Sequence, residues 1–482
     1  MRFDDLDVPF AVVADLATGD AVTLDQPSRE SQIAAQFDLI VIGTGTGGSA
    51  PASRCRSAGW RVAVVDDLPY GGTCALRGCD PKKVLVGAAE LADWNRRMRG
   101  RGLTGDARIS WPELMQFKRT FTDPVPGDRE KSFAQAGIAT YHGRARFVGS
   151  DKLSVDGHVL EARHFVIAAG AKPRRLAVPG EEHLLTSTDF LELDQLPARL
   201  AFVGAGYISF EFAHVARRAG AQATIIGRGN PLQHFEQHLA ARLVDHTRSL
   251  GIELRLDTEV TGVEKRGAGY RLLLDAQGQR ETIDADLVIH GGGRVPNTEG
   301  LDLRTANVAT EPDGGVRVNE FLQSVTNPRV YAAGDAAAAP GSLPLTPVAG
   351  YEGAIVASNL LKGNARTPDY RGIPSVVFTV PPLAGVGLTE AQAREQHLDI
   401  RVKTQDTSSW YSNRRVAETC AMFKVIVESQ TDRVAGAHLL GPHAEEVINL
   451  FALAIRSGVP ATDLKHLLYA YPTSGSDIPY MI

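Results

Sequence analysis

Two glycine-rich loops, each preceded by a short apolar run, constrain the fold of this chain more than any other feature. The first run, Phe37–Ile42, leads into Gly43, Gly45 and Gly48 in the spacing G-x-G-x-x-G, before a predicted helix over 49–58 and a strand over 61–65. The first glycine allows a tight turn, the second lets a pyrophosphate approach the backbone, and the third lets helix and strand pack closely. The helix N-terminus offers N–H groups to the phosphates. This strand–helix–strand unit predicts a dinucleotide-binding domain.

An acidic residue completes the first unit. Asp66 ends the second strand, 21 residues after Gly45. A carboxylate at this place can accept hydrogen bonds from ribose hydroxyls. Strand, helix and acid together make this pattern far more specific than a glycine-rich turn alone.

The same unit recurs about 160 residues later, which predicts a second dinucleotide-binding domain. A strand over 200–203 leads into Gly204 and Gly206, followed by a helix over about 210–219 and a strand over 223–226. The small residue Ser209 replaces the third glycine, and Arg228 stands where the acid would be. Because an arginine there suits a 2′-phosphate, we expect NADPH rather than NADH. The alternative is that Arg228 is an ordinary surface residue.

The pattern changes after about Gly363. Strands are predicted over 376–378, 384–388, 422–427 and 434–440, and helices over 390–395, 444–457 and 462–468. This segment has no phosphate loop and predicts an α+β domain. The expected fold is therefore α/β, with two Rossmann-like domains and a C-terminal α+β domain. Residues 1–36 look like an N-terminal extension, either a hairpin or partly disordered, with no assigned role.

Two of the four cysteines form a close pair. Cys74 and Cys79 are spaced C-x₄-C, about one helical turn, so their sulfurs can bond. Pro81 suits the start of a helix, which would stabilise a thiolate at Cys79 beside Lys82 and Lys83. The alternative, two small buried hydrophobic residues, is disfavoured here. Cys55 and Cys420 are interpreted as core residues, and no metal-binding spacing is found.

Charge and hydropathy exclude several classes. Lys and Arg total 51 against 56 Asp and Glu, a net charge of −5, so nucleic-acid binding is not expected. The short basic run Arg96–Arg101 is best interpreted as a solvated helix end, and alternatively helps to attract an anionic cofactor or substrate. No apolar run is long enough for a transmembrane helix, and the N-terminus lacks a signal-peptide pattern. We expect a cytoplasmic protein without membrane association.

The segment GGTC-x₄-C-x-P-K-K around Cys74 and Cys79 resembles the active site of the class I flavoprotein (pyridine nucleotide) disulfide oxidoreductases. This family includes glutathione reductase, dihydrolipoamide dehydrogenase and mercuric reductase. The resemblance extends from Phe37 to the C-terminus. In the nucleotide-binding part it includes a crossover strand (165–170), the nucleotide loop (204–211) and a returning strand (293–297). It also includes a second FAD fingerprint (331–335), a segment near the flavin (345–348) and two interface segments (373–378 and 386–389).

The resemblance implies cofactors and a domain plan. An FAD-binding domain is expected over 37–187 and 291–366, an NAD(P)H-binding domain over 188–290, and an interface domain over 367–482 that forms a homodimer. FAD is expected at Gly43, Gly45, Gly48 and Asp66, with Asp335 on its ribityl chain. The remaining expected cofactor-binding residues are Gly72, Thr73, Gly170, Gly204, Gly206, Tyr207, Arg228, Arg294 and Gly334.

It also implies residue roles. Hydride would pass from NADPH to FAD, and electrons would then pass to a Cys74–Cys79 disulfide and to a small-molecule disulfide. Cys79 would be the flavin-proximal thiol and Cys74 the thiol that attacks the substrate. Lys82 would pair with Glu211 near flavin N5, and Tyr207 would gate the nicotinamide.

The chain departs from the family at its catalytic acid–base. The His-Pro-Thr-x-x-Glu segment, contributed by the partner subunit, is replaced by Tyr471 at the His position and Ser476 at the Glu position, with Asp477 next to it. A histidine titrates at about 6.5 and a tyrosine at about 10, so Tyr471 exchanges protons poorly at neutral pH. We therefore expect an atypical disulfide substrate. The alternatives are a metal-ion or quinone reductase, and a non-enzymatic redox sensor. A standard mercuric reductase is not expected, because the C-terminus lacks a cysteine pair.

Overall fold

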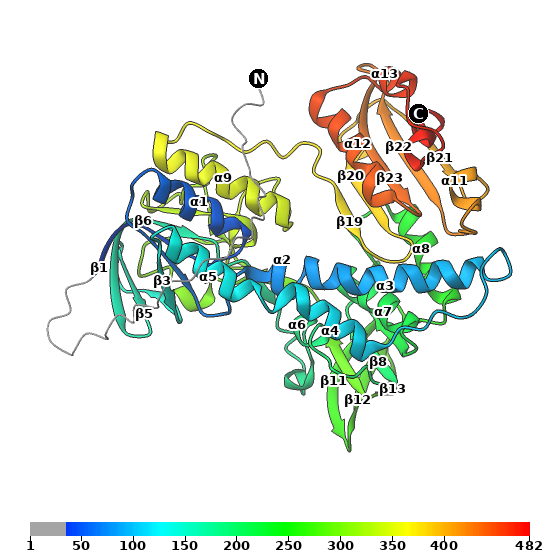
Figure 1. Ribbon diagram of the computed structural model, residues 1–482, viewed down its shortest axis with the longest axis horizontal. Coiled ribbons are helices and arrows are strands. Elements are labelled where there is room, and N and C mark those ends of the chain that lie inside the picture. Colours follow the sequence, from blue (N-terminus) through cyan, green and yellow to red (C-terminus); the bar gives the residue numbers. More distant parts are fainter. Residues whose placement is uncertain (1–34) are drawn as a thin grey trace, which may run out of the picture. The chain divides into compact units, whose positions relative to one another are not determined.

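A computed structural model describes residues 35–482 (Figure 1). The predicted extension lies outside the described residues, except that Ala35 and Gln36 begin strand β1 (Ala35–Ile42). Within the described range, no helix is both long and apolar enough to cross a membrane.

The first sheet is built around β1 and has seven strands. Its order is β3 (Ala139–His142), β2 (Val62–Asp66), β1, β6 (His158–Ile167), β5 (Lys152–Val155) and β4 (Ala145–Phe147), with β17 (Val330–Ala332) also paired to β6. The pairs from β3 to β6, and β17 with β6, are parallel. Leu39, Ile40 and Val41 are completely buried, as expected when both faces of a parallel sheet are covered.

Two helices far apart in sequence pack together over this sheet. They are α1 (Thr46–Ser57) and α9 (Thr346–Lys362), which lie side by side (Figure 1). A Cβ on Gly353 of α9 would lie 2.4 Å from the carbonyl oxygen of Gly47, so glycine is needed for this approach. The predicted first unit is thus present, with α1 starting three residues earlier than expected because it begins inside the glycine loop.

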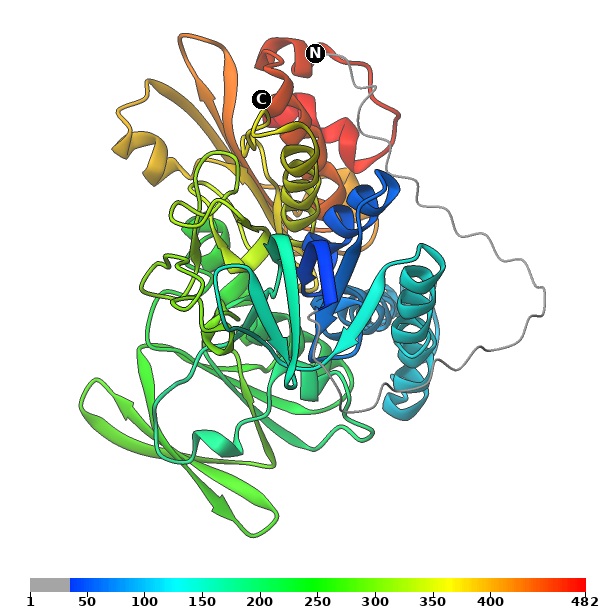
Figure 2. The ribbon, with the colours of Figure 1, turned by 90° about the vertical axis from the view of Figure 1, so that its left-hand side faces the viewer.

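The second sheet is parallel and has four strands. Its order is β10 (Glu253–Arg255), β9 (Gln222–Ile226), β8 (Arg199–Val203) and β14 (Leu287–His290). Helices α7 (Tyr207–Arg218) and α8 (Gln237–Ser249) belong to this unit. An antiparallel sheet that was not predicted packs against it, seen as green arrows in Figure 2: β11 (Thr258–Arg266), β12 (Gly269–Ala276) and β13 (Gln279–Ala285).

The two sheets are joined by a short antiparallel pair, β7 (Ala171–Pro173) with β15 (Arg294–Pro296). The predicted crossover over 165–170 therefore lies one element too early, since Phe165 and its neighbours belong to β6. The returning segment over 293–297 coincides with β15.

The C-terminal part is α+β, as predicted. Its five-stranded sheet is antiparallel throughout, in the order β19 (Ser375–Val377), β20 (Leu383–Gly387), β23 (Arg433–Leu440), β22 (Met422–Glu428) and β21 (Ile400–Asp406). Helix α12 (Ala444–Ser457) packs against it, and α10 (Glu390–Glu395) and α13 (Ala461–His466) accompany it. Strand β21 was missed because its sequence, IRVKTQD, is polar and mostly exposed.

The remaining elements are short, apart from the helices α3, α4 and α5. They are α2 (Gly72–Arg77), α3 (Cys79–Met98), α4 (Trp111–Thr122), α5 (Val125–Gln135), α6 (Ser187–Phe190), α11 (Tyr411–Arg414), α14 (Ile478–Met481), β16 (Val316–Arg317), β18 (Ala337–Ala338), and the 3₁₀ turns η1 (Glu181–His183), η2 (Glu299–Leu301), η3 (Gly334–Ala336) and η4 (Ser474–Asp477). The long helix α3 contacts α7 of the second unit (Figure 1).

Candidate active site

The first glycine loop leaves no room for side chains. Gly43 has a φ of +104°, and a Cβ there would lie 2.2 Å from the carbonyl oxygen of Ala168. A Cβ on Gly48 would lie 2.3 Å from the carbonyl oxygen of Gly43. Gly45 is the N-cap of α1, and among the described residues no side chain caps this end and no acid stands in its first turn. The N-terminus of α1 therefore remains available to phosphate.

The segment after β2 closes on this loop. The Oδ2 of Asp66 accepts hydrogen bonds from Thr44, from the backbone N–H at 2.8 Å and the hydroxyl at 2.7 Å. A Cβ on Gly72 would lie 2.4 Å from the Cα of Gly45. Thr73 is exposed on α2 directly behind it. These residues form a narrow cradle that is lined by backbone atoms and ends at the Asp66 carboxylate. Such a cradle fits the phosphates and the ribose of a dinucleotide.

A buried glutamate that the sequence analysis missed holds the loop around Asp335. Glu352 on α9 is 0% exposed and accepts hydrogen bonds from the Gly334 N–H (2.7 Å), the Ser342 hydroxyl (2.7 Å) and the Tyr370 hydroxyl (2.6 Å). Burial raises the pKa of Asp335, and the nearby Arg294 guanidinium opposes this. Gly170, between β6 and β7, accepts the Asn297 N–H at 2.9 Å and so links the two crossing strands. Glu352 could have been found from the sequence, because it is the one acidic residue in the mainly apolar sequence of α9, a pattern that indicates a buried carboxylate.

The two cysteines occupy adjacent helix segments. Cys74 lies in α2, and Cys79 is the first residue of α3, two residues before Pro81. The two cysteines are not joined in a disulfide, and their thiols are close enough for each to shift the pKa of the other. The Sγ of Cys79 also lies 3.4 Å from the Thr346 hydroxyl at the start of α9. Thr346 belongs to a segment expected near the flavin, but its contact with Cys79 was not foreseen.

The surroundings of the two thiols differ. The pKa of Cys79 is lowered to about 6, mainly by the hydrogen bond from Cys74, and further by Thr346 and the Lys82 charge, against the effect of burial. The pKa of Cys74 is raised by the same hydrogen bond and by burial. Cys79 is therefore the thiolate of the pair near neutral pH, consistent with its place at a helix N-terminus.

Asp80 lies on the other side of Cys74. Its Oδ1 is 3.9 Å from the Cys74 Sγ, and burial raises the pKa of this carboxyl above its usual value. A carboxylate in contact with a thiol can accept the proton of that thiol. Sequence reasoning missed Asp80, although it stands between the two residues, Cys79 and Pro81, that drew attention to the segment.

Lys82 and Glu211 form the expected pair. The Lys82 Nζ lies 2.9 Å from Glu211 Oε1, and their side chains are 13% and 1% exposed. The same oxygen accepts the Phe378 N–H at 2.8 Å, and Lys82 Nζ lies 4.7 Å from the centre of the Phe378 ring. This contact joins α3, α7 and the segment after β19.

The second glycine loop repeats the design of the first. Gly206 is the N-cap of α7, and no side chain among the described residues caps it. Gly204 lies against the backbone of Gly291, where a Cβ would be 2.3 Å from the carbonyl oxygen. Ser209 is completely buried in the place of the third glycine. Tyr207 is the first residue of α7 and is 47% exposed. Removal of its hydroxyl from water by the surrounding protein atoms raises its pKa to about 12. The Arg294 charge lowers this pKa, and the Glu211 and Cys79 charges raise it.

Arg228 follows β9 as predicted, but it has an acidic neighbour. Its guanidinium lies 3.1 Å from the Glu259 carboxylate on β11, and its side chain is 80% exposed. Glu259 belongs to the antiparallel sheet that was not predicted, so its contact with Arg228 could not be expected from the sequence.

Tyr471 lies in the C-terminal segment and is 82% exposed. The exposed apolar side chains Leu467, Leu468 and Tyr480 accompany it. Ser476 bonds back to Thr473 within a capping turn, while Asp477 accepts a hydrogen bond from Ser412, and burial raises the pKa of Asp477. Exposed apolar surface of this kind is typical of an interface.

A dithiol with one activated sulfur, in a fold that also has two uncapped helix N-termini after glycine loops, is typical of a dinucleotide-dependent thiol redox enzyme. Residues 37–353 match the pyridine nucleotide-disulphide oxidoreductase family, and residues 373–482 match its dimerisation domain. The chain belongs to this family, and it is an enzyme of the FAD-dependent pyridine nucleotide-disulfide oxidoreductase type. The dimerisation domain supports a homodimer.

Several proteins resemble it over most of its length. A glutathione reductase of Burkholderia cepacia is 33% identical over 439 residues, covering 91% of this chain and 96% of the relative. A mercuric reductase of Staphylococcus aureus is 33% identical over 445 residues, covering 91% of this chain and 80% of that protein. The solved Cu(II) complex of the HOCl-induced flavoprotein disulfide reductase RclA from Escherichia coli has a TM-score of 0.83 at 26% identity, covering 92% of this chain and 98% of that structure.

The family uses FAD and a pyridine nucleotide. The cradle at Gly43, Gly45 and Gly72, the uncapped N-terminus of α1 and the half-buried Asp335 carboxyl fit FAD. The uncapped N-terminus of α7 fits the second nucleotide.

Proposed function

We propose that this chain reduces a disulfide with electrons from NADPH, through Cys74 and Cys79, as a homodimer. The observation that carries the proposal is the position of Cys79. It begins α3 and contacts both Cys74 and Thr346, and its pKa is lowered. Because Tyr471 and Ser476 replace the expected His and Glu, we propose a substrate other than glutathione disulfide or dihydrolipoamide.

The proposed domains are 37–187 with 291–366 for FAD, 188–290 for the pyridine nucleotide and 367–482 for dimerisation. FAD would be held by Gly43, Gly45, Gly48, Asp66, Gly72, Thr73, Gly170, Gly334 and Asp335, and the nucleotide by Gly204, Gly206, Tyr207, Arg228 and Arg294. When bound, FAD accepts a hydride from the nicotinamide and returns an electron pair to a disulfide. Lys82 and Glu211 orient each other beside Cys79, and Tyr207 covers the nucleotide side.

The thiol steps follow from the two sulfurs. Asp80 accepts the Cys74 proton, and the Cys74 thiolate attacks one sulfur of the substrate disulfide. A mixed disulfide forms and one substrate thiolate leaves. The Cys79 thiolate then attacks the Cys74 sulfur, which releases the second substrate thiolate and leaves a Cys74–Cys79 disulfide. The two leaving thiolates take up two protons, one from Asp80 and one from solvent or the Tyr471 hydroxyl of the partner subunit.

An anaerobic titration with NADPH tests this proposal. A long-wavelength thiolate-to-flavin absorption band is expected in the wild type at the two-electron stage, when the disulfide has taken the electron pair and the flavin is oxidised. In Cys74→Ser the band should be present before NADPH is added and should disappear on reduction, because this variant has no disulfide to take the electrons. The band should be absent from Cys79→Ser throughout. Cys420→Ser is a matched control, because this buried cysteine takes no part. Flavin bleaching without the band in the wild type would refute the disulfide-reductase reading.

A second candidate is a metal-ion or quinone reductase. The similar RclA structure is a Cu(II) complex, and Tyr471 argues against efficient thiol protonation. Cu(II) ions, quinones and a panel of disulfides distinguish the two. Turnover of Cu(II) or a quinone at a rate well above every disulfide would favour the second candidate. If the Cys74→Ser Cys79→Ser variant retained that turnover, the thiols would be excluded as its route.

A further inference from the structure

A basic pocket of about 290 Å³ lies at the other end of α3 from Cys79. Three arginines from the end of α3 and the turn after it line the pocket, together with the end of α8 and the loop before β22. These residues are Arg96, Arg97, Arg101, His246, Ser249 and Thr419. At 1.5 Å per residue, the 20 residues of α3 separate the pocket from Cys79 by roughly 25–30 Å. It is therefore separate from the thiols.

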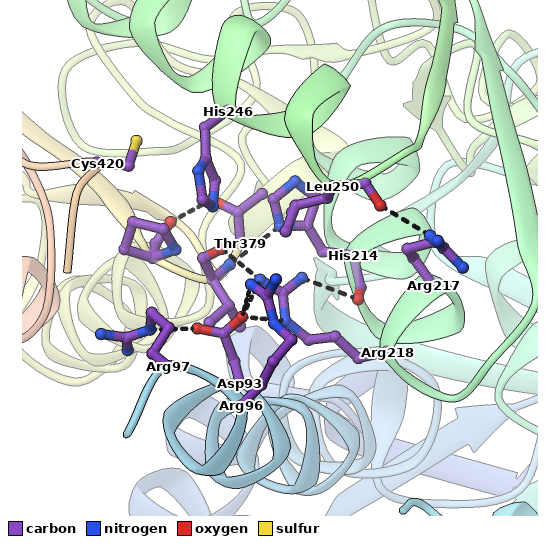
Figure 3. Close-up of polar contacts among 12 residues, drawn as sticks. Asp93, Arg96, Arg97, His214, Arg217, Arg218, His246, Leu250, Thr379 and Cys420 are labelled. Carbon is purple, nitrogen blue, oxygen red and sulfur yellow. Dashed lines mark hydrogen bonds and ion pairs between the residues drawn. The ribbon is translucent and has the colours of Figure 1, made fainter. Parts of the chain in front are cut away.

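One buried carboxylate positions three guanidinium groups at this place (Figure 3). Asp93 is 2% exposed and accepts hydrogen bonds from Arg96 Nη2 (3.0 Å), Arg97 Nε (2.7 Å) and Arg218 Nη2 (3.0 Å). Burial acts to raise the pKa of Asp93, but Arg218 and the two α3 arginines lower it to about 2. Asp93 is thus a permanent anion that fixes the three arginines in place.

The arginines outnumber their partners. Four guanidinium groups, those of Arg96, Arg97, Arg101 and Arg218, face two carboxylates. These are Asp93 and Glu418, whose Oε2 lies 3.5 Å from Arg97 Nη2 and whose pKa is raised by burial. The other nearby charges are paired, Arg242 with Asp406 at 3.3 Å and Arg248 with Asp245 at 3.5 Å. The pocket therefore carries at least two surplus positive charges, and solvent screens part of this surplus because Arg96 is 57% exposed and Arg101 is also exposed.

Several donors remain unused. Arg101 makes no ion pair within residues 35–482, and Arg96 uses only one of its nitrogens. The Nε2 atom of His246 is buried without a hydrogen-bond partner in the described part of the chain. Burial lowers the pKa of this imidazole to about 4, so at neutral pH Nε2 donates to an anion only in the tautomer that carries its proton there. Because these groups come from α3 and α8, they surround the pocket from different sides. A tetrahedral anion has oxygens in several directions and suits this arrangement better than a planar carboxylate, which one guanidinium fork satisfies.

We propose that this pocket binds a small phosphate-bearing anion, at a site separate from both dinucleotide loops. A phosphate group carries about −1.5 to −2 charges at neutral pH, which matches the surplus. The pocket volume also exceeds what inorganic phosphate needs, so a diphosphate or a phosphorylated small molecule fits. On charge pattern alone the Arg96–Arg101 run is expected to be a solvated helix end. In the structure Arg96 and Arg101 are exposed, as this prediction has it, whereas the Arg97 side chain is only 9% exposed, and all three line the pocket.

Calorimetric titration of the FAD-loaded dimer with inorganic pyrophosphate tests this inference, because no turnover is involved. We expect one site per chain in the wild type. The double variant Arg96→Gln Arg101→Gln should bind at least about tenfold more weakly, since two charge-assisted contacts are lost. Arg280→Gln is the matched control, because this arginine is exposed and lies on β13, outside the pocket.

Two further measurements test where the probe binds and which class of anion the pocket prefers. Arg228→Gln should leave pyrophosphate affinity unchanged, and saturating NADP⁺ should not displace the probe. Malonate should bind clearly more weakly than phosphate. Absence of binding, equal affinity in the double variant and the wild type, or loss of binding only in Arg228→Gln would overturn the site. Malonate binding as tightly as phosphate would overturn the phosphate class. A shift of the His246 imidazole NMR signals on pyrophosphate addition provides a readout that does not depend on the variants.

Discussion

Lys82 Nζ lies 2.9 Å from Glu211 Oε1, and that oxygen also accepts the Phe378 N–H at 2.8 Å. One carboxylate oxygen therefore connects the helix that begins with the active thiol, the first helix of the nucleotide unit and the C-terminal sheet. This ion pair is nearly excluded from water, and it fixes the relative placement of these three segments together with the Asp93–Arg218 pair further along α3 and α7.

Removing the lysine should destabilise the protein strongly. Lys82→Met leaves the carboxylate of Glu211, 1% exposed, without its cation, and breaking such a buried pair costs about 3 kcal/mol or more. Lys83→Met removes a neighbouring lysine whose pair with Glu90 is exposed, and should cost less than about 1 kcal/mol. Urea unfolding followed by circular dichroism measures both. Equal losses in the two variants would contradict the structural role of the pair.

The Cys79 thiolate should depend on Thr346. Because the pKa of Cys79 is lowered to about 6, the thiolate is present at neutral pH and is lost as the pH falls below about 6. In Cys74→Ser, whose hydroxyl keeps the hydrogen bond, the 240 nm thiolate absorbance should titrate near this value. Cys55 and Cys420 do not interfere, because burial raises the pKa of both.

Adding Thr346→Val to this variant should raise the midpoint by about one pH unit, since a hydrogen bond to the thiolate is lost. Thr346→Ser keeps the hydroxyl and should leave the midpoint in place. If valine and serine titrate alike, the contact at 3.4 Å does not stabilise the thiolate.

Cofactor preference should depend on Arg228 and Glu259. Arg228→Gln should raise the KM for NADPH about tenfold and leave the KM for NADH nearly unchanged, because only NADPH has a 2′-phosphate. Glu259→Gln removes an acid 3.1 Å from the guanidinium and should lower the KM for NADPH a few-fold. Steady-state kinetics with both nucleotides measure this. An unchanged NADPH KM in Arg228→Gln would rule out the proposed contact.

Asp80 should act only in disulfide chemistry. Asp80→Asn should lower disulfide reduction by about 100-fold, within the range of general-base catalysis, and should leave NADPH-driven quinone reduction near the wild-type rate. In the wild type, disulfide reduction should fall on the acid side as the carboxylate protonates, at a pH above the ordinary aspartate value because the pKa of Asp80 is raised. The part of the acid limb that belongs to Asp80 should disappear in Asp80→Asn, which leaves only the fall near pH 6 caused by protonation of the Cys79 thiolate. Tyr471→Phe tests the other proton donor, and a larger loss there than in Asp80→Asn would assign the main role to Tyr471.

The glycine loops, the cysteine pair and the family resemblance were enough to predict the α/β class and the two dinucleotide-binding units. They also predicted most strands of the C-terminal part, since apolar runs and helix ends are local signals. Residues 444–457 and 390–395 form helices with the predicted bounds. Contacts between residues that are far apart in the sequence could not be predicted, because they depend on how the elements pack. Thr346 is 267 residues from Cys79, and Glu259 is 31 residues from Arg228, on a sheet without a clear alternating pattern.

Among the features of the sequence, the charge patterns predicted the structure least well. The run Arg96–Arg101 gives no sign that Asp93, one turn earlier, is buried, nor that Arg218 of another unit shares its carboxylate. This network of ion pairs forms only after α3 and α7 have packed. The burial of Asp93 and the surplus of positive charge around it are therefore properties of the tertiary structure and cannot be predicted from the sequence of α3 alone.

Helix α3 is one uninterrupted piece from Cys79 to Met98. A single inserted or deleted residue within it would turn everything beyond that point by about 100° around the axis and shift it by about 1.5 Å. Asp93 would then leave Arg218, and Trp94 would take a new direction. The number of residues between the thiol and the arginines should therefore stay fixed during evolution, while the identities of the exposed residues between them are free to drift.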